Sequence, residues 1–391
     1  MTPPESAIEL GAYSATSAAN ACGTCGTRRS SPDKLTRGDD TAIERDTITV
    51  YEERAELWRD RRPARFLEHA EGLGQSLPPG VVRADLGCGA GKHLHALGRP
   101  VVALDGALAM LRLARAEAPD AWCVQADLEL LPLRRGSLGG AWARASYLHV
   151  ARNRLPWALA QLHASMTAEA PFVATFMVGD TEGTIPDDDF PGRFFACWQP
   201  DPLVDVLEGA GFKVSAYDVG EEWINVAATR ARTVPDYVGD RMRVLLVAPH
   251  PSLAAAEHGL VAADDPLWSA LIIAGAVAPD QSPLDALTAH GIGMTHLVKR
   301  TPSRDDEPEE DEYRAGAERV QRLVAWLRPE VVAVVGRAGS LAMVGGDAKP
   351  GEQRQTVAGA RVYVVPDPTD LSTPGNVDDV AAHVRAAIAL S

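Results

Sequence analysis

The chain has 391 residues, which is too long for one ordinary domain of roughly 100–200 residues and suits two. Hydrophobic residues make up 46% and charged residues 23%, a balance that excludes a disordered or fibrous chain. The formal charge of −15 excludes tight binding of nucleic acid through overall charge, so DNA is a disfavoured partner that would need a local basic patch.

The sequence carries no sign of export or of a membrane anchor. Five cysteines in a long chain do not form the regular framework of a disulfide-rich secreted protein. No stretch reaches the length of about 18 apolar residues that a spanning helix needs, and the start lacks the basic and apolar regions of a signal peptide. We therefore expect a cytoplasmic protein with no membrane partner.

Residues 1–42 are rich in Ser, Ala, Thr, Gly and Pro and have no apolar periodicity, so we expect a disordered tail. Within it, Cys22 and Cys25 form a single CxxC pair. A structural zinc site needs four ligands, and no second pair follows at a suitable spacing. We expect no metal site.

Residues 43–232 alternate between helical and strand patterns. One long helix is expected over residues 42–73, and the later helices at 107–118 and 155–166. Strands are expected at 81–85, 100–105, 121–127, 139–146 and 170–179. This alternation predicts a parallel sheet covered by helices on both faces, a three-layer α/β/α domain.

A second α/β pattern spans residues 241–391. Strands are expected at 243–249, 330–336 and 360–366, and helices at 266–276, 309–327 and 379–390. The segment 229–240, with Pro235 and Gly239, is the expected join. The fold class is therefore α/β, with two three-layer α/β/α domains in tandem.

The turn DLGCGAGKH, Asp85 to His93, separates a strand from a helix and lets the backbone approach a ligand closely. A dinucleotide fingerprint requires G-x-G-x-x-G, but Lys92 stands where the third glycine should be. A P-loop requires Ser or Thr after Gly-Lys, but His93 stands there, and Leu86 replaces the first glycine. Both alternatives fail on these residues.

The D-x-G-x-G-x-G turn resembles motif I of class I S-adenosylmethionine-dependent methyltransferases. Two further acidic strand ends, VVALD and QADL, follow in the order that this family uses. The resemblance covers residues 45–230 and implies a Rossmann-like sheet with S-adenosyl-L-methionine as cofactor. By this resemblance, Asp105 accepts the ribose hydroxyls and Asp127, with Leu128 beside it, contacts the adenine. The implied cofactor-binding set is Asp85, Gly87, Gly89, Gly91, Asp105, Asp127 and Leu128.

The acceptor side is less defined. Methyl transfer from a sulfonium depends mainly on alignment, so a base is optional. His149 follows the fourth strand and either accepts a proton or is an ordinary helix-start residue. Tyr51 lies on a segment that lids the cofactor in this family, and packing explains it equally well. No N-P-P-[YFW] motif follows the strand, so the acceptor is unknown, either a small molecule or a nucleobase.

Residues 291–340 resemble the mismatch-specific thymine/uracil-DNA glycosylases of the uracil-DNA glycosylase superfamily. The G-x-T-x-L-V-x-R turn, E-Y-R-A-G helix and R-P-x-V-V-A-x-x-G strand occur in the family's order. The resemblance extends over 241–391 and implies a uracil-DNA glycosylase-like parallel sheet. The two loops that carry the family's chemistry are altered. His250 stands where an Asn positions water, and Leu267 where an aromatic ring stacks on the base. The other changed positions are Ala248, Pro249, Ser252, Asp367 and Asp370.

His250 would be catalytic only if glycosylase activity is retained. Residues 240–391 hold 14 Lys and Arg against 21 Asp and Glu, a charge of −7, whereas DNA glycosylases usually carry a basic face. Three interpretations stay open: a degenerate module for recognition, base excision on an unusual substrate, or binding of a nucleotide. Our main hypothesis is a methyltransferase with a degenerate glycosylase-like module, and the alternative is a base-excision or base-binding protein.

Overall fold

The computed structural model describes residues 40–261, 265–302, 306–346, 348–368 and 376–391. Most of the expected tail, with Cys22 and Cys25, lies outside these residues, as does Asp370. The tail was expected to reach residue 42, but helix α1 (Asp40–Glu53) already begins at Asp40. No helix in the described part of the chain is long and apolar enough to cross a membrane.

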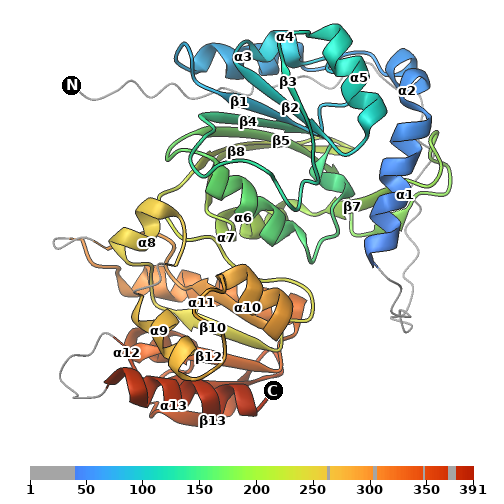
Figure 1. The fold of residues 1–391 in the computed structure, drawn as a ribbon. Coiled ribbons are helices and arrows are strands. Elements are labelled where there is room, and N and C mark those ends of the chain that lie inside the picture. The colour runs from blue at the N-terminus through green and yellow to red at the C-terminus, as the bar shows by residue number, and fades with distance from the viewer. Residues whose placement is uncertain (1–39, 262–264, 303–305, 347, 369–375) are drawn as a thin grey trace.

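The chain forms two sheets, which occupy separate parts of the molecule in Figure 1. In the first sheet the parallel strands run in the order β3-β2-β1-β4-β5, and β9 pairs antiparallel with both β5 and β8. Strands β7 and β6 extend this sheet from the carboxyl end of β5. The strands are β1 (Arg83–Leu86), β2 (Val101–Asp105), β3 (Trp122–Gln125), β4 (Gly140–Arg144), β5 (Pro171–Val178), β6 (Glu182–Thr184), β7 (Phe194–Trp198), β8 (Phe212–Val219) and β9 (Trp223–Arg230).

Helices cover both faces of the first sheet, as the alternating sequence pattern predicts. Helices α3 (Leu67–Ser76), α4 (Leu94–Leu97) and α5 (Leu108–Glu117) pack on one face, around Trp142. Helices α6 (Leu155–Ser165) and α7 (Pro200–Gly209) pack on the opposite face. Strand β1 is buried along its whole length because it lies at the centre of the sheet. The prediction of an α/β protein with a mainly parallel sheet is confirmed.

The prediction of one helix over residues 42–73 is wrong. The segment forms three helices, α1, α2 (Ala55–Arg61) and α3, with a break at Arg54 and an extended stretch after Arg61. Pro63 explains the longer break, because proline disfavours helical geometry in the residue before it. The break lets α1 and α2 lie beside α5.

The second sheet has the order β11-β10-β12-β14-β13. Its first four strands are parallel, and β13 pairs antiparallel with β14. Helices α9 (Pro266–Ile273) and α13 (Asn376–Ala389) pack on one face, and α11 (Glu310–Leu327) and α12 (Gly336–Met343) pack on the other. The strands are β10 (Val244–Ala248), β11 (Ile292–His296), β12 (Val331–Val335), β13 (Gly351–Val357) and β14 (Ala360–Val365). The sequence patterns did not predict β13, α12, α8 (Leu253–His258) or α10 (Pro283–His290).

The expected join at 229–240 is a buried segment rather than an exposed linker. Tyr237 pairs with Met294 of β11, and Asp236 is only 2% exposed. Asp236 accepts hydrogen bonds from Lys299 at 2.9 Å and from Arg319 at 2.7 Å. These two cations hold the pKa of Asp236 below its usual value, although burial acts in the opposite direction. The segment is therefore tied to the second sheet by buried ion pairs.

Candidate active site

A cavity of about 1130 Å³ lies at the carboxyl ends of β1, β2 and β4, where open α/β sheets bind ligands. Helices α1 and α2 contribute part of its wall. Six of the seven residues predicted to bind the cofactor line this cavity: Asp85, Gly87, Gly89, Asp105, Asp127 and Leu128. Gly91 is not among its lining residues, but His149 is.

Asp85 lies on the central strand β1 and is only 2% exposed. Its Oδ2 is buried without a hydrogen-bond partner. Burial, with a smaller contribution from Asp105, raises the pKa of Asp85 to about 8. A buried carboxyl group with an unused oxygen at a cavity wall suits the ammonium group of an amino-acid ligand.

We expect Asp85→Asn to change how stability depends on pH. The pKa of Asp85 is raised from 3.8 to about 8 in the folded protein, so the folded state holds this proton more tightly than the unfolded state. The resulting stability is complete below 3.8 and is lost as the pH rises through about 8. Urea unfolding across this range should give Asp85→Asn a flatter profile than the wild type. Parallel profiles of the variant and the wild type would contradict the raised pKa of Asp85.

Asp105 ends β2, and its carboxylate organises the glycine turn. Oδ2 accepts the Gly89 N–H at 2.9 Å, and Oδ1 accepts the Ala107 N–H at 2.9 Å. Burial raises the pKa of Asp105 to about 6, although these two bonds act against it. Each carboxylate oxygen can accept a second hydrogen bond, so Asp105 keeps the capacity to bind ribose hydroxyls.

The glycine turn approaches neighbouring side chains too closely for larger residues. A Cβ atom at Gly87 would lie 2.4 Å from Ser146 Cβ, and one at Gly89 would lie 3.2 Å from the Trp58 ring. Gly91 differs, because a Cβ atom there would lie 2.7 Å from Ala114 Cα of α5. Gly91 therefore allows close packing of the turn against a helix, while Gly87 and Gly89 shape the cavity.

The predicted adenine-side residues follow β3. Asp127 Oδ1 accepts the Glu129 N–H at 2.9 Å, which closes a short turn. Trp157 Nε1 donates to Glu129 Oε2 at 2.9 Å. Burial, with a smaller contribution from Asp127, raises the pKa of Glu129 to about 7. Asp127 and Leu128 thus reach the cavity from a fixed turn.

Two side chains of the turn hold the segment that follows α2 over the cavity. Lys92 Nζ donates to the carbonyl oxygens of Arg59, at 2.6 Å, and of Arg62. His93 Nε2 lies 2.9 Å from the Arg65 carbonyl oxygen. The segment is therefore fixed to the same turn that shapes the cavity.

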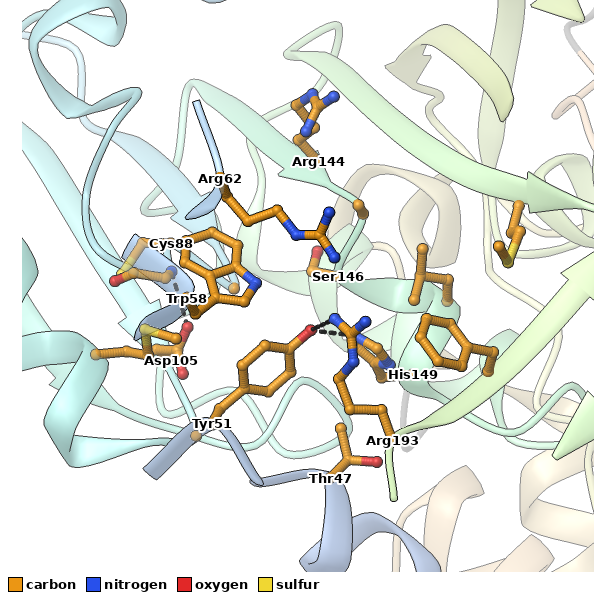
Figure 2. A pocket seen from close by; sticks show the side chains of 18 of the residues that line it. Thr47, Tyr51, Trp58, Arg62, Cys88, Asp105, Arg144, Ser146, His149 and Arg193 are labelled. Carbon is orange, nitrogen blue, oxygen red and sulfur yellow. Dashed lines mark hydrogen bonds between the residues drawn. The ribbon is translucent and has the colours of Figure 1, made fainter. Parts of the chain in front are cut away.

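Tyr51, His149 and Arg193 form a hydrogen-bonded group in the cavity wall (Figure 2). His149 Nδ1 lies 2.6 Å from the Phe194 carbonyl oxygen, which can only accept, so Nδ1 carries the proton. Nε2 of the neutral ring then accepts from the Tyr51 hydroxyl at 2.9 Å, and Arg193 Nη1 donates to that hydroxyl at 3.0 Å. Burial lowers the pKa of His149 to about 4. His149 is thus a neutral acceptor, and its unprotonated nitrogen already accepts a hydrogen bond from Tyr51.

The sequence alone did not single out Trp58, Arg193 or Arg144, which also line this cavity. The aromatic stretch FPGRFF around Arg193 was the available signal. Arg193 lies within 6 Å of the ring centres of Tyr51, Phe190 and Phe195. This stretch lies next to α1 only in the folded chain, so no local sequence pattern connects Arg193 with Tyr51.

His250 lies two residues after β10, in the part of the chain that contains the second sheet, and does not line this cavity. It is half-buried, and its Nδ1 lies 3.4 Å from the Pro251 carbonyl oxygen. Ser252 caps α8 by accepting the Ala255 N–H. Leu267 is 5% exposed and packs in the core, so it does not offer a stacking face. Across the described ranges, no three His, Cys, Asp or Glu side chains gather to hold a metal ion.

Residues 84–169 match a family model described as a methyltransferase domain. Three solved structures are also similar to this chain. A 1,6-didemethyltoxoflavin-N1-methyltransferase from Burkholderia thailandensis is 18% identical over 51% of this chain and 93% of its own, with a TM-score of 0.41. An S-adenosylmethionine-dependent methyltransferase from Mesorhizobium loti is 20% identical over 42% and 100%, with a TM-score of 0.35. One from Methanosarcina mazei is 14% identical over 44% and 99%, with a TM-score of 0.38.

The matched residues run from β1 past α6 and include the glycine turn, Asp105, Asp127 and His149. The chain therefore contains a methyltransferase domain at residues 84–169.

Proposed function

We propose that this protein transfers the methyl group of S-adenosylmethionine to an acceptor that binds beside the cofactor in the same cavity. The observation that carries the proposal is a cavity of about 1130 Å³ at the carboxyl edge of the first sheet. Cavities for one drug-sized ligand usually measure roughly 300–1,000 Å³, so this volume suits a cofactor together with a small acceptor.

The side chains of the cavity fall into two groups. Trp58, Cys88 and Asp105 lie on one side of the view in Figure 2, and Ser146 and His149 lie on the other. The first group surrounds the ends of β1 and β2, where we place the cofactor. The second group follows β4, and we place the acceptor there.

Bound S-adenosylmethionine supplies a methyl group on a cationic sulfur. The chain has to align the two reactants and keep water out, because an in-line displacement depends on positioning. Tyr51 of helix α1 and Trp58 of helix α2 cover one side of the cavity. Tyr51 is held in place by His149 and Arg193, so these three residues serve to position the reactants.

Transfer of label from S-adenosyl[methyl-³H]methionine tests this proposal. The protein would be incubated separately with small-molecule, protein and nucleic-acid fractions of a cell extract. We expect label to enter the small-molecule fraction and to fall sharply with Asp105→Ala. Label that enters only protein or nucleic acid would contradict a small acceptor, and the absence of transfer to every fraction would contradict the proposed activity.

We further propose that residues 241–391 are a glycosylase-like module that recognises a ligand without excising bases. The parallel order β11-β10-β12-β14 and the motifs of residues 291–340 support a relation to that superfamily. His250 in place of the water-positioning Asn and the charge of −7 over residues 240–391 argue against excision. Incubation with duplex DNA that holds a G·U or G·T mismatch should produce no alkali-sensitive strand breaks. Breaks that His250→Ala abolishes would establish the alternative, base excision.

A further inference from the structure

Arg144 is the last residue of β4 and lines the cavity. Its guanidinium lies 4.7 Å from the centre of the Phe66 ring, and its Nε is buried without a hydrogen-bond partner. Among the described residues, no carboxylate forms an ion pair with Arg144. Arg62 and Arg193, in the same cavity, differ because they pair with Asp189 and Asp188.

A partly buried cation without a counter-ion is unfavourable, because burial removes water that the protein does not replace. Burial, with a smaller contribution from Arg65, lowers the pKa of Arg144 to about 10. The guanidinium nevertheless stays charged at neutral pH. The cavity therefore offers a planar cation that an anionic ligand would neutralise.

The position of Arg144 favours the acceptor over the cofactor as that ligand. The residues predicted to bind the cofactor follow β1, β2 and β3, whereas Arg144 ends β4. In Figure 2, Arg144 lies on the side of Ser146, away from Asp105 and Trp58. The cofactor also brings a positive sulfur, which attracts an anionic acceptor as the guanidinium does.

We propose that Arg144 binds an anionic group, a carboxylate or a phosphate, of the methyl acceptor. This inference rests on the proposed function, because it assumes that the cavity holds both reactants. The planar guanidinium can donate two parallel hydrogen bonds to such a group, which a lysine ammonium cannot reproduce. The contact with the Phe66 ring, 4.7 Å from the guanidinium, restricts where this group can lie.

Calorimetry on the protein saturated with S-adenosylhomocysteine tests the proposal, with benzoate and inorganic phosphate as anionic probes and benzamide as the neutral match for benzoate. We expect the wild type to bind at least one anion. Arg144→Met should weaken that binding by roughly tenfold or more, and Arg144→Lys should restore it only in part. Benzamide should bind equally to all variants. Arg112→Met, which removes an exposed arginine of α5, is the matched control and should change nothing.

Thermal unfolding without ligand separates a binding role from a structural one. Arg144→Met removes an unpaired buried charge, so its melting temperature should equal or exceed that of the wild type. The proposal is overturned if neither anion binds the wild-type complex, if Arg144→Met binds them equally, or if it lowers the melting temperature. It is also overturned if Arg144→Met loses affinity for S-adenosylhomocysteine, because Arg144 would then belong to the cofactor. Failure of the folded wild type to bind S-adenosylhomocysteine would instead remove the proposed function itself.

Discussion

Replacing Gly87 by alanine should lower the free energy of unfolding by about 2–4 kcal/mol, because backbone strain and overpacking act together. Gly87 has a φ of +71°, and an added Cβ would lie 2.4 Å from Ser146 Cβ. Ser146 cannot yield through a rotamer change, because its Cβ is fixed to the backbone. The distorted turn should also weaken binding of S-adenosylhomocysteine by more than tenfold. Urea unfolding and calorimetry measure the two effects.

Gly80→Ala is the matched control for this substitution. Gly80 has a similar φ of +80°, but a Cβ atom there would meet nothing within 4 Å. The control therefore carries the backbone strain without the steric overlap, and should cost only about 1 kcal/mol. Cofactor affinity should stay at the wild-type level. Equal losses of stability and affinity in the two variants would show that close approach at Gly87 is unimportant.

Replacing Arg193 by methionine should cost about 3–5 kcal/mol, because it leaves a buried carboxylate without its partner. The side chains of Arg193 and Asp188 are 8% and 7% exposed. Although burial acts against ionisation, hydrogen bonds and charge from Arg193 hold the pKa of Asp188 below its usual value. The substitution also frees the Tyr51 hydroxyl from one donor. Urea unfolding of the variant near neutral pH measures the loss.

Two further variants test whether the uncompensated charge of Asp188 causes the loss of stability. Arg322→Met breaks the ion pair of Arg322 with Asp205, whose side chains are 58% and 25% exposed, and should cost less than about 1 kcal/mol. Adding Asp188→Asn to Arg193→Met removes the uncompensated charge and should recover part of the stability. A double variant that is no more stable than Arg193→Met would contradict the charge explanation.

Local sequence signals predicted the central part of the fold, and six of the seven residues predicted to bind the cofactor line the cavity. Strand β1, the glycine turn and Asp105 are close in sequence, and their order forms the motif. A local sequence pattern is therefore sufficient to predict that they lie together. Helical periodicity continues across Arg54, so the sequence pattern predicts one helix there instead of two. Pro63 is the local signal for the second interruption. Strand β13 has the polar sequence GEQRQTV with little apolar alternation, so only its pairing with β14 defines it.

The acceptor side could not be predicted in the same way. Tyr51 and His149 are 98 residues apart, and Tyr51 and Arg193 are 142 apart, so no local pattern could pair them. That His149 accepts a proton stays a prediction. The hydrogen bond from the Tyr51 hydroxyl to its unprotonated nitrogen favours a positioning role instead. Gly91 matched the motif, but its role in packing against Ala114 depends on where α5 lies.

Calorimetric titration with S-adenosylhomocysteine, on the wild type and on Asp105→Ala, measures whether the cavity binds the cofactor and whether Asp105 holds it. Asp105→Ala removes the proposed ribose acceptor and the partner of the Gly89 amide, and should weaken binding roughly tenfold or more. Asp120→Ala, an exposed carboxylate paired with Arg99, is the matched control and should bind like the wild type. We expect one cofactor to bind per chain, with affinity lost only in Asp105→Ala. A correctly folded wild type that does not bind, or an Asp105→Ala variant that binds equally well, would contradict this expectation.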